Sequence, residues 1–469
     1  MAGKRTSAAL GIAGAVAALG VGTAFGTIVL DSSQPATGPS PAAIHKATSK
    51  KPAKNVIFLL GDGMGVQEIT AARYYQGAEN PLTIDKLPFT GFDTTWSVKP
   101  GEGADLLPDY NPDSASTASM WATGQKTIDE RISQGPSSAE DVPGENLRTV
   151  LEEAQDQGKR VGSVSTAEVT DATPAAIASH MSVRACQGPE NMQACPLETK
   201  AAGGLGSIAE QEADHELDVL LGGGRFRFEQ TIDAGPDAGM TVVESAQANG
   251  ARYVTDADSL ADLTGSEPVL GLFSDTTMAV EWTGPAATLG KGNDPVSCTE
   301  GQRPPEQPSL ARMTGKALEL LKNRKGFFLQ VEGASIDKQD HIANACGQIG
   351  ETVAFNRAIR RALSFQRNNP STLIVVTADH SQASQVVSED SEGSTLPTGY
   401  SANLTSKDGQ TLTLSYGTSG YGGPGAPPVA TPPSQQHTGA VVPVWAKGPG
   451  AIKVLGTNDQ TDLFHTLGG

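Results

Sequence analysis

Residues 55–65 read Asn-Val-Ile-Phe-Leu-Leu-Gly-Asp-Gly-Met-Gly, an apolar run that ends in a glycine-rich turn carrying Asp62. An apolar run this short and rich in branched side chains predicts a strand buried on both faces of a sheet. Runs of the same kind, bounded by Gly, Asp or Ser, recur at 56–60, 161–165, 219–221, 269–273, 327–331, 373–377 and 441–445.

Helix-like patterns lie between several of these runs, for example at 145–157 and 352–365. Alternation of strands and helices predicts an α/β fold whose central sheet is large and mostly parallel. In sheets of this kind the functional site forms at the carboxyl ends of the strands. The side chains that directly follow the runs are therefore the first candidates for chemistry.

The composition restricts the classes of partner. The chain has 469 residues and a formal net charge of -18, and 38% of its residues are hydrophobic. It is therefore expected to be globular, and the negative charge argues against nucleic acid binding, because the phosphate backbone would be repelled. An anionic small substrate would also be disfavoured, unless a local site reverses the sign of the charge.

The N-terminus predicts export. Lys4 and Arg5 precede an uncharged stretch at 7–30 that is rich in Ala, Gly, Val and Leu. We interpret 1–30 as a signal peptide, with a retained N-terminal membrane anchor as the alternative, since the stretch is long enough to cross a bilayer. Residues 31–54 are rich in Pro, Ser, Ala and Lys and predict a flexible linker, and 55–469 predict a single catalytic domain.

Four cysteines allow three disulfide pairings, and the sequence alone does not choose among them. Closeness favours Cys186–Cys195, which leaves Cys298–Cys346. None of them belongs to a Cys-x-x-Cys pair, so a thiolate zinc site is not expected. An even number of cysteines fits the oxidising compartment that an exported chain reaches.

Acidic residues and histidines stand where predicted strands end. Asp62 follows 56–60, Glu332 follows 327–331, and Asp379 and His380 follow 373–377. Taken singly, each is best explained by a turn or a helix cap. Taken together, they would meet at one edge of a parallel sheet and could bind metal.

A second pair supports the same interpretation. Asp337 and His341 are four residues apart, so on a helical turn they face one side and can share a cation. His180, by contrast, ends a helix-like run and is expected to be structural.

Ser114 follows Asp113 and precedes a run of small residues that predicts a helix start. A capping serine is the simplest explanation, but backbone N–H groups at a helix start also bind phosphate. The segment from Asp171 to Thr173, with Arg184 further on, is the third notable feature. Two stretches do not fit the strand–helix alternation: 284–308, a surface excursion held by its cysteine, and the long segment 388–436, which contains a predicted hairpin turn at 407–409.

With these motifs in this order, the chain resembles a bacterial alkaline phosphatase from residue 54 essentially to its C-terminus. The matching segments are 55–70, 108–124, 164–184, 331–351, 375–384 and 437–439. The resemblance implies an α/β three-layer sandwich with a large, mostly parallel central sheet flanked by helices. It also implies hydrolysis of small phosphate monoesters through a phosphoserine intermediate, and a homodimer. The N-terminal segment independently predicts a location in the cell envelope or outside the cell.

Position by position, the resemblance implies a site with two zinc ions and one magnesium ion. The implied ligands are Asp337, His341 and His437 for one zinc, Asp62, Asp379 and His380 for the other, and Asp62, Thr173 and Glu332 for magnesium.

The remaining implied roles concern phosphate. Ser114 would be the nucleophile, and Arg184, oriented by Asp113, would hold the phosphoryl group, with Asp171 and Lys338 close by. The four ligand carboxylates would face six positive charges from three divalent ions, so the pocket would attract a phosphate dianion inside a strongly negative protein.

Two kinds of alternative stay open. A phosphodiesterase or a sulfatase of the same superfamily would share the metal ligands, although Ser114 beside Asp113, together with Arg184, favours monoesters. An exported protein that binds phosphate or metal without turnover is the alternative outside enzymes.

Overall fold

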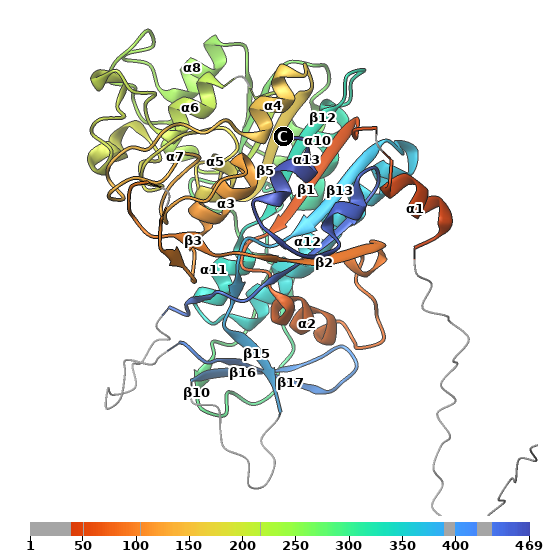
Figure 1. Cartoon of the computed structure of the whole chain (residues 1–469). Helices are drawn as coiled ribbons and strands as arrows, with labels where there is room; N and C mark the ends of the chain where they lie inside the picture. The colour runs from red at the N-terminus through yellow and green to blue at the C-terminus, as the bar shows by residue number, and fades with distance from the viewer. Residues whose placement is uncertain (1–38, 50, 104, 216, 389–398, 420–433) are drawn as a thin grey trace, which may run out of the picture. The chain divides into compact units, whose positions relative to one another are not determined.

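The computed structural model describes residues 39–49, 51–103, 105–215, 217–388, 399–419 and 434–469 (Figure 1). Its centre is a ten-stranded sheet in the order β20-β2-β19-β13-β1-β12-β5-β6-β8-β7. The strands are β1 (Asn55–Gly61), β2 (Phe89–Thr94), β5 (Arg160–Glu168), β6 (Val219–Gly223), β7 (Arg252–Val254), β8 (Val269–Leu272), β12 (Phe327–Gly333), β13 (Thr372–Thr377), β19 (Val442–Lys447) and β20 (Gly456–Asp459).

Most of this sheet is parallel, as predicted. β1 pairs in parallel with β12 and β13, and the parallel order continues through β5, β6, β8 and β7. β19, at the run predicted over 441–445, is antiparallel to both β13 and β2. All seven residues of β1 are buried, which explains why its sequence is apolar throughout.

Helices cover both faces of the sheet, and β1 shows the division. Val56, Phe58 and Leu60 belong to a core cluster shared with α3 (Ser114–Thr123), α4 (Val150–Asp156) and α13 (Asp462–Leu467). Ile57 and Leu59 belong to the cluster shared with α10 (Leu310–Leu320) and α12 (Ala345–Asn368). The fold is therefore a three-layer α/β sandwich.

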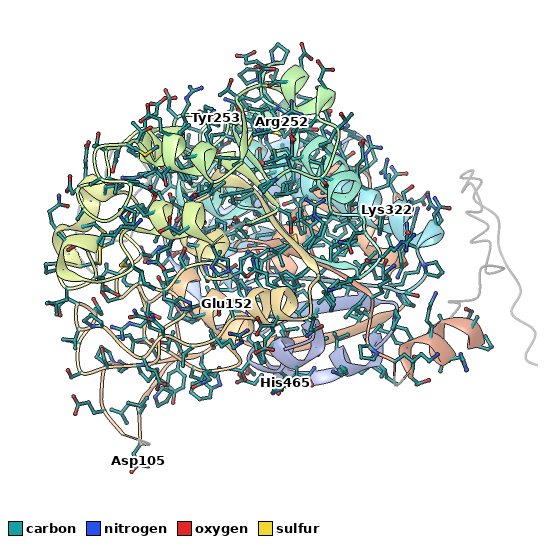
Figure 2. All side chains as sticks on the ribbon, turned by 90° about the horizontal axis from the view of Figure 1, so that it is seen from above. Asp105, Glu152, Arg252, Tyr253, Lys322 and His465 are labelled. Atoms are coloured by element: carbon teal, nitrogen blue, oxygen red, sulfur yellow. A yellow bond between two sulfur atoms is a disulfide. The ribbon has the colours of Figure 1, made fainter. Side chains whose placement is uncertain are left out.

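Figure 2 looks along a different direction and separates the two helical layers. Glu152 of α4 and His465 of α13 lie on one side, and Lys322, just after α10, lies on the other. The helix predicted over 145–157 is shorter than expected, because Thr149 caps α4 in a capping box with Glu152. The helix predicted over 352–365 lies within the longer α12.

The predicted flexible linker is wrong for part of its length. Residues Pro41–Ala47 form a helix, α1, and Ala47 is buried in the core. The Ser40 side chain accepts a hydrogen bond from the Ala43 N–H, and Pro41 occupies the first helical position. Serine and proline, typical of linkers, are here a helix cap and a helix start. The predicted signal peptide or anchor at 1–30 lies outside the described residues, among which no helix is long and apolar enough to cross a membrane.

A smaller four-stranded sheet is formed by β10 (Thr288–Leu289), β15 (Ser384–Val387), β16 (Tyr400–Thr405) and β17 (Thr411–Tyr416). β16 and β17 form the hairpin predicted at 407–409, whose Gly409 has a φ of +82°. Both favoured disulfides are present: Cys186–Cys195 and Cys298–Cys346. The second joins the 284–308 excursion to α12.

Candidate active site

The carboxyl ends of three neighbouring strands bring the predicted acidic residues together. β1 lies between β12 and β13, and Leu60 of β1 is level with both Glu332 and Thr377. Asp62 follows β1 and Asp379 follows β13, so the three acidic side chains come from adjacent positions at one edge of the sheet. Each of them is at most 6% exposed.

Asp337 is the common member of two groups that could hold a metal ion. It lies in α11 (Ser335–His341), one turn before His341, whose Nε2 is 3.3 Å from Asp337 Oδ2. His437 Nε2 is 3.5 Å from Asp337 Oδ1 and 3.0 Å from His341 Nε2. Asp337, His341 and His437 offer ligand atoms that all lie within 4.8 Å of one another.

The second group is formed by Asp62, Asp337 and His380, under the same distance limit. His380 Nε2 is 3.6 Å from Asp62 Oδ1 and 3.1 Å from Asp379 Oδ2. The rings of His380 and His437 stack with centroids 3.6 Å apart. β14 (Ser381–Gln382) pairs with β18 (His437–Thr438), which places His437 beside His380 despite their distance in sequence.

Glu332 and Thr173, two further predicted site residues, are connected through β12. Glu332 accepts a hydrogen bond from the Ser165 hydroxyl. Thr173 lies in α5 (Ala172–Ala175), and its carbonyl accepts a bond of 2.8 Å from Gln330 Nε2. Gln330 and Glu332 share one face of β12, because side chains alternate along a strand, so Thr173 is held on the face that Glu332 occupies.

The chemistry of these residues fits bound cations. Buried atoms without a hydrogen-bond partner in the described structure include Asp62 Oδ1, Asp379 Oδ2, His380 Nδ1 and Thr173 Oγ1. Burial, and then the carboxylates of Asp379 and Asp337, raise the pKa of Asp62 well above its usual value. Burial raises the pKa of Glu332 to about 8. Cations would satisfy the unpartnered atoms and offset the repulsion, and imidazole and carboxylate suit zinc, whereas oxygen ligands suit magnesium.

Ser114 is the first residue of α3 and lies beside the histidines. Asp113 caps this helix, its side chain accepting a bond of 2.9 Å from the Ser116 N–H. The Ser114 hydroxyl is 3.2 Å from His380 Nε2, and the residue is 3% exposed. The hydroxyl therefore faces the candidate metal groups, at a helix end that favours anions.

The Asp171 carboxylate lies between two positively charged side chains, Arg184 and Lys338. It accepts a bond of 2.8 Å from Arg184 Nη2 and one of 2.6 Å from Lys338 Nζ. Arg184 Nη1 also donates to Asp113, at 3.1 Å. Although burial opposes ionisation, Lys338 and Arg184 hold the pKa of Asp171 well below its usual range. The family resemblance implies Asp113 as the partner of Arg184, whereas in the structure the guanidinium contacts the carboxylates of both Asp113 and Asp171.

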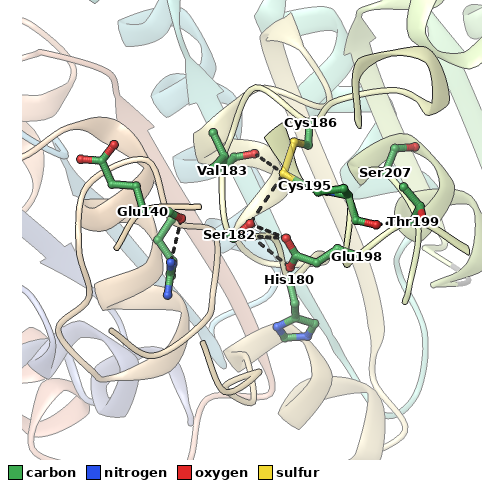
Figure 3. The surroundings of a disulfide bond; sticks show 12 residues. Glu140, His180, Ser182, Val183, Cys186, Cys195, Glu198, Thr199 and Ser207 are labelled. Atoms are coloured by element: carbon green, nitrogen blue, oxygen red, sulfur yellow. Dashed lines mark hydrogen bonds between the residues drawn. A yellow bond between two sulfur atoms is a disulfide. The ribbon is translucent and has the colours of Figure 1, made fainter. Parts of the chain in front are cut away.

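The residues on either side of Arg184 are fixed by a buried carboxylate and a disulfide (Figure 3). The buried Glu198 accepts hydrogen bonds from both the N–H and the hydroxyl of Ser182, and the Cys186–Cys195 disulfide closes the loop beyond Arg184. The Arg184 N–H donates to the Glu130 carbonyl at 2.7 Å. His180 contacts the Ser133 carbonyl through Nδ1 at 2.9 Å, in keeping with the structural role expected for it.

Sequence reasoning missed the groups that support the ligands. Gln382 Nε2 donates to Asp337, and His341 Nδ1 is 2.5 Å from the Gln435 carbonyl. Partners of this kind fix the orientation of a ligand ring or carboxylate. Gln382 lies two residues after His380, but an amide at that position carries no metal signature of its own, and a backbone carbonyl leaves no trace in the sequence.

Comparisons of the sequence with known proteins identify phosphatases. A family model described as alkaline phosphatase matches residues 53–422. The chain is 46% identical over 441 residues to alkaline phosphatase of Escherichia coli K12, covering 92% of this chain and 88% of that protein. It is 44% identical to streptomycin-6-phosphate phosphatase of Streptomyces griseus, covering 92% and 93%.

Solved structures agree on the fold. The alkaline phosphatase of Thermus thermophilus superimposes with a TM-score of 0.63 at 20% identity, covering 91% of this chain and 93% of that one. The enzyme of the Antarctic bacterium TAB5 gives 0.61 at 22% identity, covering 89% and 97%. A variant of the Antarctic enzyme was solved with magnesium bound.

Proposed function

The chain belongs to the alkaline phosphatase family, and from that premise we propose that it hydrolyses phosphate monoesters through a phosphoserine formed on Ser114. Membership of the family makes it a metal-dependent phosphomonoesterase. The observation that carries the assignment of Ser114 is its position: the hydroxyl is 3.2 Å from His380 Nε2, at the start of α3.

Two zinc ions and one magnesium ion are the proposed cofactors. The proposed ligands are Asp337, His341 and His437 for one zinc, Asp62, Asp379 and His380 for the other, and Asp62, Thr173 and Glu332 for magnesium. When bound, such cations stabilise the negative charge on the attacking and leaving oxygens.

Ser114 performs the bond-making step. Its hydroxyl loses a proton as Oγ attacks phosphorus, the bond from phosphorus to the ester oxygen breaks, and the alcohol leaves with a proton. Water then attacks the phosphoserine, which releases inorganic phosphate and restores the hydroxyl. A position at the start of α3 suits this role, because the N-terminal end of a helix attracts the phosphoryl charge.

Arg184 binds the phosphoryl oxygens. Its guanidinium can donate two parallel hydrogen bonds, a geometry that lysine cannot offer. Asp113 and Asp171 orient it, with contacts of 3.1 Å and 2.8 Å. Lys338, joined to Asp171 at 2.6 Å, adds a positive charge on the same side of the site.

Export is part of the proposal, since two disulfides need an oxidising compartment. A homodimer, and a membrane tether through the N-terminus, stay predictions. The relative from Streptomyces griseus is named for streptomycin 6-phosphate, and small phosphate monoesters form the substrate class to screen.

The test of the reaction class compares p-nitrophenyl phosphate with its bis-ester, with zinc and magnesium added and then with EDTA. We expect a strong preference for the monoester that is lost on chelation. A preference for the diester would move the enzyme to the phosphodiesterase branch, and cleavage of sulfate esters instead would move it to the sulfatases. Absence of turnover with full metal content would leave a binding protein.

The test of the nucleophile is Ser114→Ala. Acid quenching during turnover of labelled substrate should trap phosphate on the wild-type chain and none on the variant. Metal content should be unchanged, because Ser114 is not among the proposed ligands. Labelled phosphate still bound covalently to the variant would exclude Ser114 as the nucleophile.

A further inference from the structure

A pocket of about 180 Å³, open to solvent on one side, lies at the edge of the central sheet opposite the candidate active site. Its wall is formed by the start of β2, the ends of β19 and α12, and one face of α1, the helix at the right of Figure 1. Lys447, the last residue of β19, is level with Ile374 near the amino end of β13. The metal groups follow the carboxyl end of the same strand, through Asp379, so the length of β13 separates the two places.

Three positively charged side chains line this pocket: Lys46 of α1, Arg367 of α12 and Lys447 of β19. Burial, and then the charges of Arg367 and Lys46, lower the pKa of Lys447, so the three charges lie close together. No acidic residue lines the pocket in the described part of the chain, since the rest of the wall is uncharged: Ala43, Pro88, Phe89, Gln366, Pro370 and Gly448. In a chain with a net charge of -18, this is a local reversal of sign.

Two partly buried lysines elsewhere show the usual arrangement for such a cation. Lys126 Nζ is 2.9 Å from a carboxylate oxygen of Asp459, and Lys338 Nζ is 2.6 Å from one of Asp171. Lys447 is also partly buried, but among the described residues its ammonium group has no hydrogen-bond or ion-pair partner. Its neighbours in the pocket are like charges instead.

The other two cations of the pocket also keep free donors. Lys46 is partly buried, and its ammonium group has no partner among the residues that the structure describes. Arg367 is exposed, and its Nη2 donates to the Ser364 hydroxyl at 3.0 Å, which leaves the other N–H groups of the guanidinium available. Repulsion among the three charges and the partial loss of water both disfavour this arrangement, and an anion held between them would offset both costs.

Hydrogen bonds beneath the pocket hold its cations in place. The buried Gln366 donates from Nε2 to the Thr372 carbonyl at 3.0 Å and to the Lys447 carbonyl at 2.9 Å, so it ties the end of α12 to two strands. Gly448 has a φ of +122°, and a Cβ there would lie 2.2 Å from the Thr372 carbonyl oxygen, so this close approach requires glycine. The backbone next to Arg367 and Lys447 is therefore fixed before any ligand binds.

We propose that this pocket binds a phosphate group, held by Lys46, Arg367 and Lys447. A phosphate group offers negative charge and several acceptor oxygens, which three cations with free donors can share, and arginine can bind two of these oxygens at once. Two sources provide this chemistry: free inorganic phosphate, and the phosphodiester headgroup of an anionic phospholipid, whose glycerol would lie against the uncharged wall. The proposal does not depend on the reaction at the metal groups.

The test is residue-resolved labelling of amines on the full-length, metal-loaded protein. Trace acetylation is carried out with phosphate, or with chloride at the same ionic strength, and mass spectrometry measures the labelling of each lysine. At a phosphate concentration about 10 times the dissociation constant, we expect labelling of Lys46 and Lys447 to slow roughly 10-fold, because only the unoccupied fraction reacts. Lys322, an exposed lysine just before β12 that is labelled in Figure 2, should not be protected.

A second ligand separates the two sources. Glycerophosphoglycerol, the water-soluble headgroup of phosphatidylglycerol, is a diester and therefore not a substrate of a phosphomonoesterase. Protection of Lys447 at a lower concentration of this compound than of inorganic phosphate would assign the pocket to a lipid headgroup. The reverse order would assign it to free phosphate, and protection by neither compound would overturn the proposal.

Two variants with the same change of charge complete the experiment. Arg367→Gln should raise the phosphate concentration that half-protects Lys447 by roughly 10-fold, the effect of losing one charged hydrogen bond. Lys322→Gln, outside the pocket, should leave that concentration unchanged, and both variants should fold and keep phosphatase activity, because both side chains are exposed. Equal protection by chloride, equal protection of Lys322, or an unchanged concentration in Arg367→Gln would each contradict a phosphate site.

Discussion

The chain buries acidic side chains in two very different settings. At the carboxyl ends of β1, β12 and β13, several carboxylates converge, and histidines, Arg184, Lys338 or hydroxyl groups lie within a few ångströms of them. In α6 (Ile208–Asp214), which packs near the amino ends of β6 and β8, Glu212 is buried and neither of its carboxyl oxygens has a hydrogen-bond partner among the described residues. Burial of an acid is common to both, so burial does not identify the chemistry. The number and kind of groups that share the space do: convergence points to cations held by several ligands, whereas an isolated carboxyl group leaves an unpaired polar group in the core.

The largest expected difference between the two settings is in catalysis. Asp337→Ala removes a carboxylate from both candidate metal groups and should lower kcat/KM by roughly 10³-fold or more, since metal stabilisation of the transition state is worth several kcal/mol. Glu212→Gln should change kcat/KM less than about twofold, because Glu212 is distant from the candidate active site and shares no partner with its residues. Kinetics with p-nitrophenyl phosphate and zinc analysis of both variants check this, and a similar loss in both would end the distinction.

A smaller effect is expected inside the first setting. Asp171→Asn should weaken inhibition by inorganic phosphate by roughly 10- to 100-fold, because Asp171 orients Arg184 and also contacts Lys338. Asp113→Asn removes one contact of Arg184 and keeps a side chain able to cap α3, so its loss should be smaller. Phosphate inhibition constants rank the two variants, and an equal loss would mean that the link to Lys338 adds nothing.

The smallest expected effect concerns stability in the second setting. Glu212→Leu should raise the free energy of unfolding by about 1–3 kcal/mol, the usual cost of an unpaired buried polar group. Burial raises the pKa of Glu212 in the folded state above its value in the unfolded chain. The wild-type protein is therefore most stable at low pH, where Glu212 is neutral in both states, and it loses that stability as the pH rises through the folded-state pKa.

The advantage of Glu212→Leu over the wild type should therefore grow from pH 5 towards alkaline pH. Denaturant unfolding at several pH values measures it, with Glu229→Gln as the exposed control. A difference that stays constant with pH would mean that Glu212 is paired or solvated in solution.

Much of the first setting could be predicted from the sequence, and the reason is local. An apolar run followed by Asp62, or by Asp379 and His380, marks a strand and the residue at its end, and parallel strands bring such ends together. The double contact of Arg184 with Asp113 and Asp171 could not be predicted, because it depends on how α5 packs against the loop held by Glu198. The Gln382 and Gln435 contacts likewise depend on pairing between distant strands.

The second setting was invisible in the sequence. Glu212 stands among Gln, Glu, Ala and Asp, a composition typical of an exposed helix, and only the tertiary structure turns that face of α6 toward the core. The same limit explains α1, whose Ser40 and Pro41 belong to a linker-like composition and become a cap only because Ala47 finds a place in the core. Composition alone therefore does not determine whether a segment is buried or helical, because that depends on how the segment packs against the rest of the chain.

The separation of Asp62 and His437 along the chain has a consequence for biogenesis. Asp62 directly follows β1, the first strand of the central sheet, and His437 lies in β18 near the C-terminus, so the two candidate metal groups together need both ends of the domain. A growing polypeptide folds from its N-terminal side as it is made. It would carry Asp62 for most of its synthesis before His437 is made. If the proposed ligands are right, we expect an incomplete chain to hold metal only weakly and phosphatase activity to begin only after His437 has been made, which for an exported chain means on the far side of the membrane.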